Sequence, residues 1–295
     1  MTKRTIVTVG LCLGLTFGVQ QTASAERGHD ARSGPRADDP VLVWNETAAD
    51  AAIAAGITPI FDPLHESRLY AMTQVAVHDA LNTIDRRYQP YALHADVQPD
   101  ANTDAAVATA AHDVLVPVLG ALPDLFPPAA AIELVEGRYT AALAAIPDSP
   151  AKGAGIDVGR AAAGAILDRR ADDGSDRVFL DTEYPEGTEP GQFRYVEGAP
   201  FAVAPHWGEV TPFVMTTGSE LRPRPPDDLT SSDYAGDFNE LKSLGAIDST
   251  ARTPEQTEIG YFWFEASPLR WNRIARTAAP TAGLDMWETP GSSAS

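Results

Sequence analysis

The stretch that decides the fold runs from Glu66 to Ile84 and reads ESRLYAMTQVAVHDALNTI. Apolar residues recur at helical spacing on two sides of this segment. One side carries Leu69, Met72, Ala76 and Ala80, and the other carries Tyr70, Val77, Leu81 and Ile84. A helix that is apolar on two sides is surrounded by other elements, so this segment is predicted to lie in the centre of a helical bundle.

The helical pattern continues on both sides of this segment. Further helices are predicted over residues 48–55, 103–122, 129–146, 151–170, 232–245, 253–264 and 267–278. The sharpest start is Thr253-Pro254-Glu255-Gln256, where Thr253 supplies the N-cap, Pro254 fits the first turn and Gln256 closes a capping box. The sequence contains neither an internal repeat nor a β-rich region, so the fold class is predicted to be all-α.

Residues 175–230 interrupt the helical pattern with many prolines and glycines. Only short pieces, 193–196 and 212–215, look like strands. An irregular connection of this length is predicted to be functional or to pack as an excursion over the core.

The N-terminus has the pattern of a secretory signal peptide. Lys3 and Arg4 precede an apolar run that ends in Ala23-Ser24-Ala25, so cleavage is expected after Ala25 and the protein is expected to be secreted or periplasmic. Cys12 is interpreted as part of the signal core, because Leu11 is too bulky for a lipidation site. Residues 26–40 are polar and rich in charge, glycine and proline, which predicts a disordered leader.

Charge and cysteine content exclude several classes of partner. The formal net charge is −19, and loss of Lys3 and Arg4 with the signal would make it −21. Such a charge disfavours nucleic acid and anionic membranes as partners, and solubility is its simplest explanation. The single cysteine would leave with the signal, so neither a disulfide nor a thiolate metal site is expected.

A polar stripe on the central helix is the main candidate for chemistry. Gln74, His78, Asn82 and Asp85 share one side of it, and a histidine beside a carboxylate can act as a general base. The alternatives are a satisfied hydrogen-bond network or a solvated face, and we favour them because no nucleophile accompanies the stripe. The pair His65-Glu66, which follows Pro63 at the expected helix start, is interpreted as capping the same helix and complementing its dipole.

Metal and nucleotide sites are not predicted. The spacing of His65, His78, His94 and His112 places no two histidines on one helix face. The segment from Asp168 to Asp176 resembles a calcium loop but has Arg169 and Ala171 at ligand positions, so it is interpreted as a helix end and a turn. Nucleophile-elbow and phosphate-loop patterns are absent from the sequence. The aromatic residues at 261–264 and Trp271 are expected to be helical core.

Several phrases in series resemble the vanadium-dependent haloperoxidase-like family, which shares its anion site with type 2 phosphatidic acid phosphatases. They are VWN at 43–45, SRLYAM at 67–72, VHDALN at 77–82, YQPY at 88–91, RRADDG at 169–174, PF at 212–213, PP at 225–226, DFNELK at 237–242, RTPEQTE at 252–258, FW at 262–263 and WNRIA at 271–275. The resemblance implies two helical bundles, with vanadate or phosphate held over the second bundle by residues near the C-terminus.

The expected anion motifs do not occur in this sequence. They are Lys-x6-Arg-Pro, Pro-Ser-Gly-His and an arginine six residues before a histidine. Lys152 and Lys242, for example, are followed at the required distance by Gly159 and Ser249. We therefore name no catalytic, cofactor-binding or metal-binding residue, and expect no cofactor in this chain, although intact relatives would hold vanadate.

Three hypotheses follow for residues 41–288. The first is a truncated, inactive, secreted haloperoxidase-like or acid phosphatase-like domain whose second bundle is incomplete and whose helix near Glu288 is cut off by the tail 289–295. Uncovered apolar helix faces would then favour self-association. The second is a non-catalytic helical binding or structural protein. A third, weaker hypothesis is a hydrolase built around His78 and Asp79.

Overall fold

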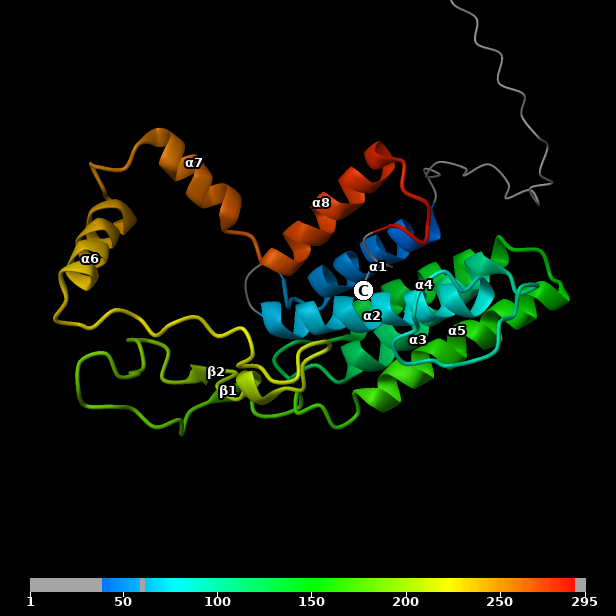
Figure 1. The fold of residues 1–295 in the computed structure, drawn as a ribbon, viewed down its shortest axis with the longest axis horizontal. Helices are drawn as coiled ribbons and strands as arrows, with labels where there is room; N and C mark the ends of the chain where they lie inside the picture. The colour runs from blue at the N-terminus through cyan, green and yellow to red at the C-terminus, as the bar shows by residue number, and fades with distance from the viewer. Residues whose placement is uncertain (1–38, 59–61, 290–295) are drawn as a thin grey trace, which may run out of the picture. The chain divides into compact units, whose positions relative to one another are not determined.

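The protein is mostly helical, as the sequence predicts. The computed structural model describes residues 39–58 and 62–289, and these contain eight α-helices, one 3-10 helix and one two-stranded sheet (Figure 1). The α-helices are α1 (Pro40–Ala54), α2 (Pro63–Ile84), α3 (Thr103–Gly120), α4 (Ala129–Ala144), α5 (Pro150–Arg169), α6 (Ser232–Gly245), α7 (Pro254–Trp263) and α8 (Ser267–Ala282). The all-α prediction is confirmed.

Helix α2 is the central element, as its two apolar sides predict. It packs against α1, α3, α5 and α8. Every residue from Met72 to Ile84 is buried, including the polar ones. This part of the helix has no solvent-facing side, so its polar side chains must find partners inside the protein.

The α3–α5 contact is the closest in the bundle. A Cβ atom placed on Gly159 of α5 would lie 2.5 Å from the carbonyl oxygen of Ala106 and 2.7 Å from the Cβ of Thr109. One turn earlier, a Cβ on Gly155 would lie 2.3 Å from the carbonyl oxygen of Asn102. The two glycines therefore let the backbones of α3 and α5 approach at distances that any side chain would prevent.

Two helices begin earlier than predicted. Helix α1 starts at Pro40 rather than at residue 48, because Asp39 caps it by accepting a hydrogen bond from the amide of Val41. The expected leader 26–40 is therefore wrong at its end, and its first residues lie outside the described chain. Helix α2 starts at Pro63, and its N-cap is Asp62 rather than the pair His65-Glu66.

The long connection contains strands, but not where they were expected. Strands β1 (Leu180–Asp181) and β2 (Ala202–Val203) pair antiparallel, with Leu180 opposite Val203. The predicted pieces 193–196 and 212–215 are not strands, and Val196 forms only an isolated bridge with Ala199. A short strand forms only where a second segment pairs with it, and local apolar pattern does not reveal the partner.

Helices α6 and α7 contain no buried residue. The capping box of α7 is present as predicted. The expectation that the aromatic residues form helical core is wrong: Tyr261, Phe262, Trp263, Phe264 and Trp271 are between 51% and 77% exposed. No other described element covers this aromatic cluster, and burial depends on such a neighbour as well as on apolar character.

Helix α8, predicted over 267–278, extends to Ala282 and ends at a glycine. It stops at Ala282, and Gly283 follows in the left-handed conformation with a φ of 69°. The next turn folds back onto the core, because Arg87 forms an ion pair of 2.8 Å with Asp285 and its guanidinium lies 4.1 Å from the centre of the Trp287 ring. Thr289 is buried, and its hydroxyl donates a hydrogen bond to the carbonyl of Asp285.

The predicted signal peptide 1–25 and residues 290–295 lie outside the described residues. Among the helices that are described, none is both long and apolar enough to cross a membrane.

The α3–α5 contact can be tested with two glycines of one helix. Gly159→Ala should lower the free energy of unfolding by about 1–3 kcal/mol, because its Cβ would overlap the backbone of α3. Gly164→Ala, where a Cβ meets nothing within 4 Å, should instead raise it by about 0.5–1 kcal/mol through helix propensity. Urea denaturation measures both, and equal effects of the two substitutions would contradict the close contact.

Candidate functional site

Asp79 of α2 holds the loop that follows the helix. One carboxylate oxygen accepts a hydrogen bond of 2.7 Å from the amide of Tyr91, and the other accepts from the amides of Ala92 and Leu93 at 2.7 and 2.8 Å. The side chain is completely buried. Asp79 therefore acts as an anchor for backbone, and both of its oxygens are engaged in that role.

Asn82 and His78 extend the same anchor along the predicted polar stripe. The side-chain oxygen of Asn82 accepts from the amides of Arg87 and Tyr88, and a ring nitrogen of His78 lies 3.0 Å from the carbonyl oxygen of Gln89. For these two residues the hydrogen-bond network that we favoured is confirmed.

The other two members of the stripe behave differently. Gln74 is buried, but its side-chain amide has no hydrogen-bond partner among the described residues. Asp85 lies beyond the helix, is half exposed and pairs with Arg87. The structure therefore does not bring all four stripe residues together into one site.

A second polar cluster joins α2 to the end of α5. One carboxylate oxygen of Asp173 accepts hydrogen bonds from Nε of Arg68 at 2.8 Å and from Nε of Arg170 at 2.9 Å. Burial alone would raise the pKa of Asp173, but hydrogen bonds from Arg68 and Ser175 outweigh it, so the pKa lies below its ordinary value. The carboxylate therefore stays charged between the two guanidinium groups.

This cluster also fixes one end of the long connection. Nη2 of Arg170 donates to the carbonyl of Thr211 at 2.6 Å, and the amide of Thr211 donates to the carbonyl of Asp173. The Arg170 guanidinium lies 4.1 Å from the centre of the Phe213 ring. The hydroxyl of Tyr91 donates to the carbonyl of Phe213 at 2.6 Å. The excursion predicted for 175–230 thus packs on the core at 207–215.

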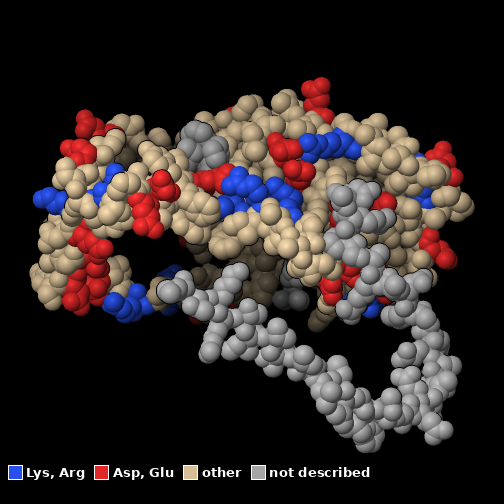
Figure 2. All heavy atoms as spheres, turned by 90° about the horizontal axis from the view of Figure 1, so that it is seen from above, with Lys and Arg blue, Asp and Glu red and all other residues tan. Residues whose placement is uncertain are grey.

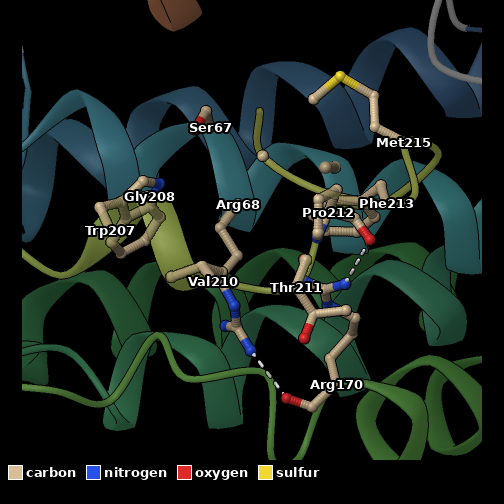
Figure 3. Close-up of a pocket in the computed structure, with 12 residues that line it drawn as sticks. Ser67, Arg68, Arg170, Trp207, Gly208, Val210, Thr211, Pro212, Phe213 and Met215 are labelled. Atoms are coloured by element: carbon tan, nitrogen blue, oxygen red, sulfur yellow. Dashed lines mark hydrogen bonds between the residues drawn. The ribbon is translucent and has the colours of Figure 1, made fainter. Parts of the chain in front are cut away.

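A pocket of about 420 Å³ lies between this segment and α2 (Figure 3). Its lining residues are Ser67, Arg68, Ala71, Arg170, Trp207, Gly208, Val210, Thr211, Pro212, Phe213, Met215 and Gly218. The walls are mainly apolar, and the lining contains two arginines and no carboxylate. This combination of apolar walls and cationic groups makes it a candidate ligand site.

The sequence interpretation did not single out this site. It correctly treated Asp168 to Asp176 as a helix end and a turn, but it assigned no role to Asp173. One signal was available, since Arg68 stands between Ser67 and Leu69 in a helix predicted to be buried. A guanidinium in such a helix requires an anionic partner, although the sequence does not say which one.

Glu66 is the least satisfied charged group of α2. It is completely buried, and neither carboxylate oxygen forms a hydrogen bond of normal geometry with the described residues. Burial raises the pKa of Glu66 to about 7, against a smaller opposing effect of the nearby Tyr70 and Thr58 hydroxyls. The hydroxyls are close enough to act on the charge, but the absence of well-formed bonds supports the raised value. Glu66 is therefore not the cap that was expected.

The histidines do not gather. His65 contacts Asp62 at 2.6 Å and His112 contacts Asp113 at 2.7 Å, on different helices, and His94 is exposed. Within the part of the chain that the structure describes, no group of three or more His, Cys, Asp or Glu side chains is placed to hold a metal ion.

Acidic and basic side chains are interspersed on the face of the molecule shown in Figure 2. The net charge of −19 is therefore not spread as a uniform negative surface on that face, and basic groups still occur in local clusters. An anion that approaches the protein meets this local charge once it is within about 10 Å at ordinary ionic strength.

Comparisons with family models, with curated proteins and with solved structures found no match for this chain.

The buried Glu66 predicts an unusual dependence of stability on pH. Because its pKa is about 7 in the folded protein and near 4.5 when unfolded, its favourable contribution is complete below about pH 4.5 and is lost as pH rises through 7. Glu66→Gln should raise the free energy of unfolding at pH 8 by up to about 3 kcal/mol and flatten its slope between pH 5 and 8. Urea titrations across pH measure this, and Glu46→Gln, an exposed position on α1, should leave the slope unchanged.

The three hydrogen bonds that Asp79 accepts predict a large loss of stability when its carboxylate is replaced by an amide. Asp79→Asn leaves one carbonyl oxygen for three backbone amides, so the free energy of unfolding should fall by about 2–4 kcal/mol. Asp85→Asn, which changes a half-exposed carboxylate on the same helix end, should change it by less than about 0.5 kcal/mol. Chemical denaturation measures both, and an unchanged midpoint for Asp79→Asn would show that the anchor is not needed.

Proposed function

We propose that residues 41–288 form a helical domain of the vanadium-dependent haloperoxidase-like type, consisting of one bundle and part of a second. We further propose that this chain by itself catalyses neither peroxide-dependent halide oxidation nor phosphoester hydrolysis. Export is part of the proposal and rests on the signal-like pattern from Lys3 to Ala25 alone.

The observation that carries the family proposal is that phrases distant in sequence contact each other in pairs. Arg68 of the SRLYAM phrase binds Asp173 of the RRADDG phrase. Asp79 of VHDALN accepts from the amide of Tyr91 in YQPY, whose hydroxyl donates to Phe213 of PF.

The VWN and WNRIA phrases meet in the same way. The side-chain amide of Asn45 donates to the side-chain oxygen of Asn272 at 2.7 Å, and Arg276, just after the second phrase, donates to Asn45 at 2.6 Å. Phrases that share contacts in this way are what a single scaffold requires, and they supply structural roles rather than a reaction centre.

The inactivity proposal rests on chemistry that the sequence lacks. Oxyanion stabilisation at a vanadate or phosphate site needs several converging cations and hydrogen-bond donors, together with a histidine that binds the metal or attacks phosphorus. The three motifs that would supply them do not occur between residues 1 and 295. His78, the histidine of the VHDALN phrase, is engaged with the loop at Gln89.

A second candidate function is a non-catalytic binding protein. It is favoured by one specific observation, the pocket between α2 and residues 207–218, which has apolar walls and an arginine at its base. The two candidate functions explain the exposure of the aromatic cluster, residues 261–264 and Trp271, in different ways. An incomplete second bundle would leave these side chains without their normal cover, whereas a binding protein keeps them exposed without associating.

The test uses purified residues 26–295 with vanadate, bromide and peroxide on a phenol dye, and separately with an aryl phosphate. Neither brominated dye nor released phosphate should exceed the rate of vanadate in buffer, while a known bromoperoxidase and a phosphatase serve as positive controls. A rate typical of such enzymes would contradict the proposal. Activity that disappears in His78→Ala would support the hydrolase hypothesis instead.

Sedimentation of the same preparation separates the two candidates. Concentration-dependent association that Trp263→Ser weakens, and that Leu125→Ser in the connection between α3 and α4 leaves unchanged, would favour the incomplete-bundle interpretation. Both side chains are more than half exposed, which makes the pair a matched control. A monomer that melts cooperatively would favour the binding protein.

A further inference from the structure

We propose that the pocket between α2 and residues 207–218 binds a small aromatic carboxylate, with the carboxylate on Arg68 and the ring against the apolar walls. This proposal does not depend on the family proposal, because it uses only the contacts around the pocket.

Arg68 has hydrogen-bond donors to spare. Its Nε donates to Asp173 and its Nη2 donates to the carbonyl of Arg170 at 3.2 Å. Its Nη1 makes no hydrogen bond with any described residue, although the side chain is only 14% exposed. A guanidinium held on one edge and open on another is pre-organised to accept a carboxylate.

The local charge favours an anion. Two guanidinium groups line the pocket, and among residues 39–58 and 62–289 the only carboxylate bound to them is that of Asp173, which both share. Asp173 remains ionised because its pKa is lowered, so it offsets one positive charge and leaves one. In a partly desolvated pocket this remaining charge acts more strongly than it would on an open surface.

The apolar walls of the pocket favour a ligand with an apolar ring system. Figure 3 shows Trp207 and Phe213 on opposite sides of Arg68, with Met215 above Phe213 in this view. Ala71 and Val210 complete the apolar surface. A pocket of about 420 Å³ is at the small end of the range for ligand sites, which fits an acid with one or two rings.

The pocket is formed before any ligand arrives. Arg170 holds the carbonyls of Thr211 and Pro212, and Tyr91 holds the carbonyl of Phe213. A Cβ on Gly218 would lie 2.7 Å from the carbonyl oxygen of Gly208, so the backbone approaches closely between these two residues of the lining. A preformed wall lowers the ordering cost of binding.

The experiment is calorimetric titration of residues 26–295 with 2-naphthoate, and with two probes that each lack one feature. 2-Naphthamide keeps the rings without the charge, and acetate keeps the charge without the rings. We expect 2-naphthoate to bind with one-to-one stoichiometry and at least tenfold more tightly than either probe.

Two matched variants assign the binding to this pocket without disturbing the buried ion pairs. Met215 is 38% exposed, so both Met215→Glu and Met215→Gln should fold. Met215→Glu brings a negative charge to the pocket wall and should weaken the binding of 2-naphthoate at least tenfold. The neutral Met215→Gln should change the affinity less than threefold. Arg68→Lys should weaken it as well, because an ammonium cannot bind a carboxylate through two parallel hydrogen bonds.

Three results would overturn the proposal. The first is the absence of 2-naphthoate binding to a protein whose circular dichroism shows it to be folded. The second is equal binding of 2-naphthamide or acetate, which would remove the charge or the ring from the recognition. The third is equal weakening by Met215→Glu and Met215→Gln, which would make the effect steric. The outcome of the peroxidase and phosphatase assays does not change the interpretation of these three results.

Discussion

Every residue of α2 from Met72 to Ile84 is buried, so none of the polar side chains in that stretch can be satisfied by bulk water. For several of them the partners come from backbone that folds onto the helix, whereas the side-chain amide of Gln74 has no hydrogen-bond partner among the described residues. Asp79 and Asn82 bind the amides of the loop at 87–93, and Arg68, one turn before the fully buried stretch, binds the turn after α5 through Asp173. The irregular segments around α2 are therefore positioned by its polar groups, while the regular helices are positioned by its apolar ones.

Helices of the packed core have neighbours that cover their apolar side chains, whereas, among the described residues, α6 and α7 do not. Helices α3 and α5 meet through Gly155, Gly159 and small buried residues such as Ala106, and the contact is close at these two glycines. Helices α6 and α7 have strong start signals but no buried residue. A cap and good propensity are enough to define a helix locally, but tertiary stability comes from a covered apolar face. Helix α7 has the local signals that define a helix, but its exposed aromatic side chains show that its apolar residues are not covered by another described element.

The sequence predicted most of the helices and the central place of α2, because period and capping are local properties that residues such as Thr253 and Gln256 display directly. It placed the start of α1 too late because the Asp39-Pro40 signal was attributed to a leader. It did not predict the pocket, since Arg68 and Asp173 are 105 residues apart and nothing local pairs them. The strands failed for the same reason, because Leu180 acquires its partner Val203 only in three dimensions.

Helix α8 is held by a different kind of contact from the one that holds α5. Asn45 of α1 binds both Asn272 and Arg276. Leu269 and Ala279 of α8 are buried, whereas Trp271 is more than half exposed. On the same side of α2, Glu66 is buried without a well-formed hydrogen bond, and the charge of Glu265, just before α8, adds to the rise in its pKa. Polar pairs gain little net free energy and depend on exact geometry, whereas close-packed area accumulates over many contacts. The attachment of α8 to α1 therefore depends in part on the alignment of polar groups, whereas that of α5 to α3 depends on close packing.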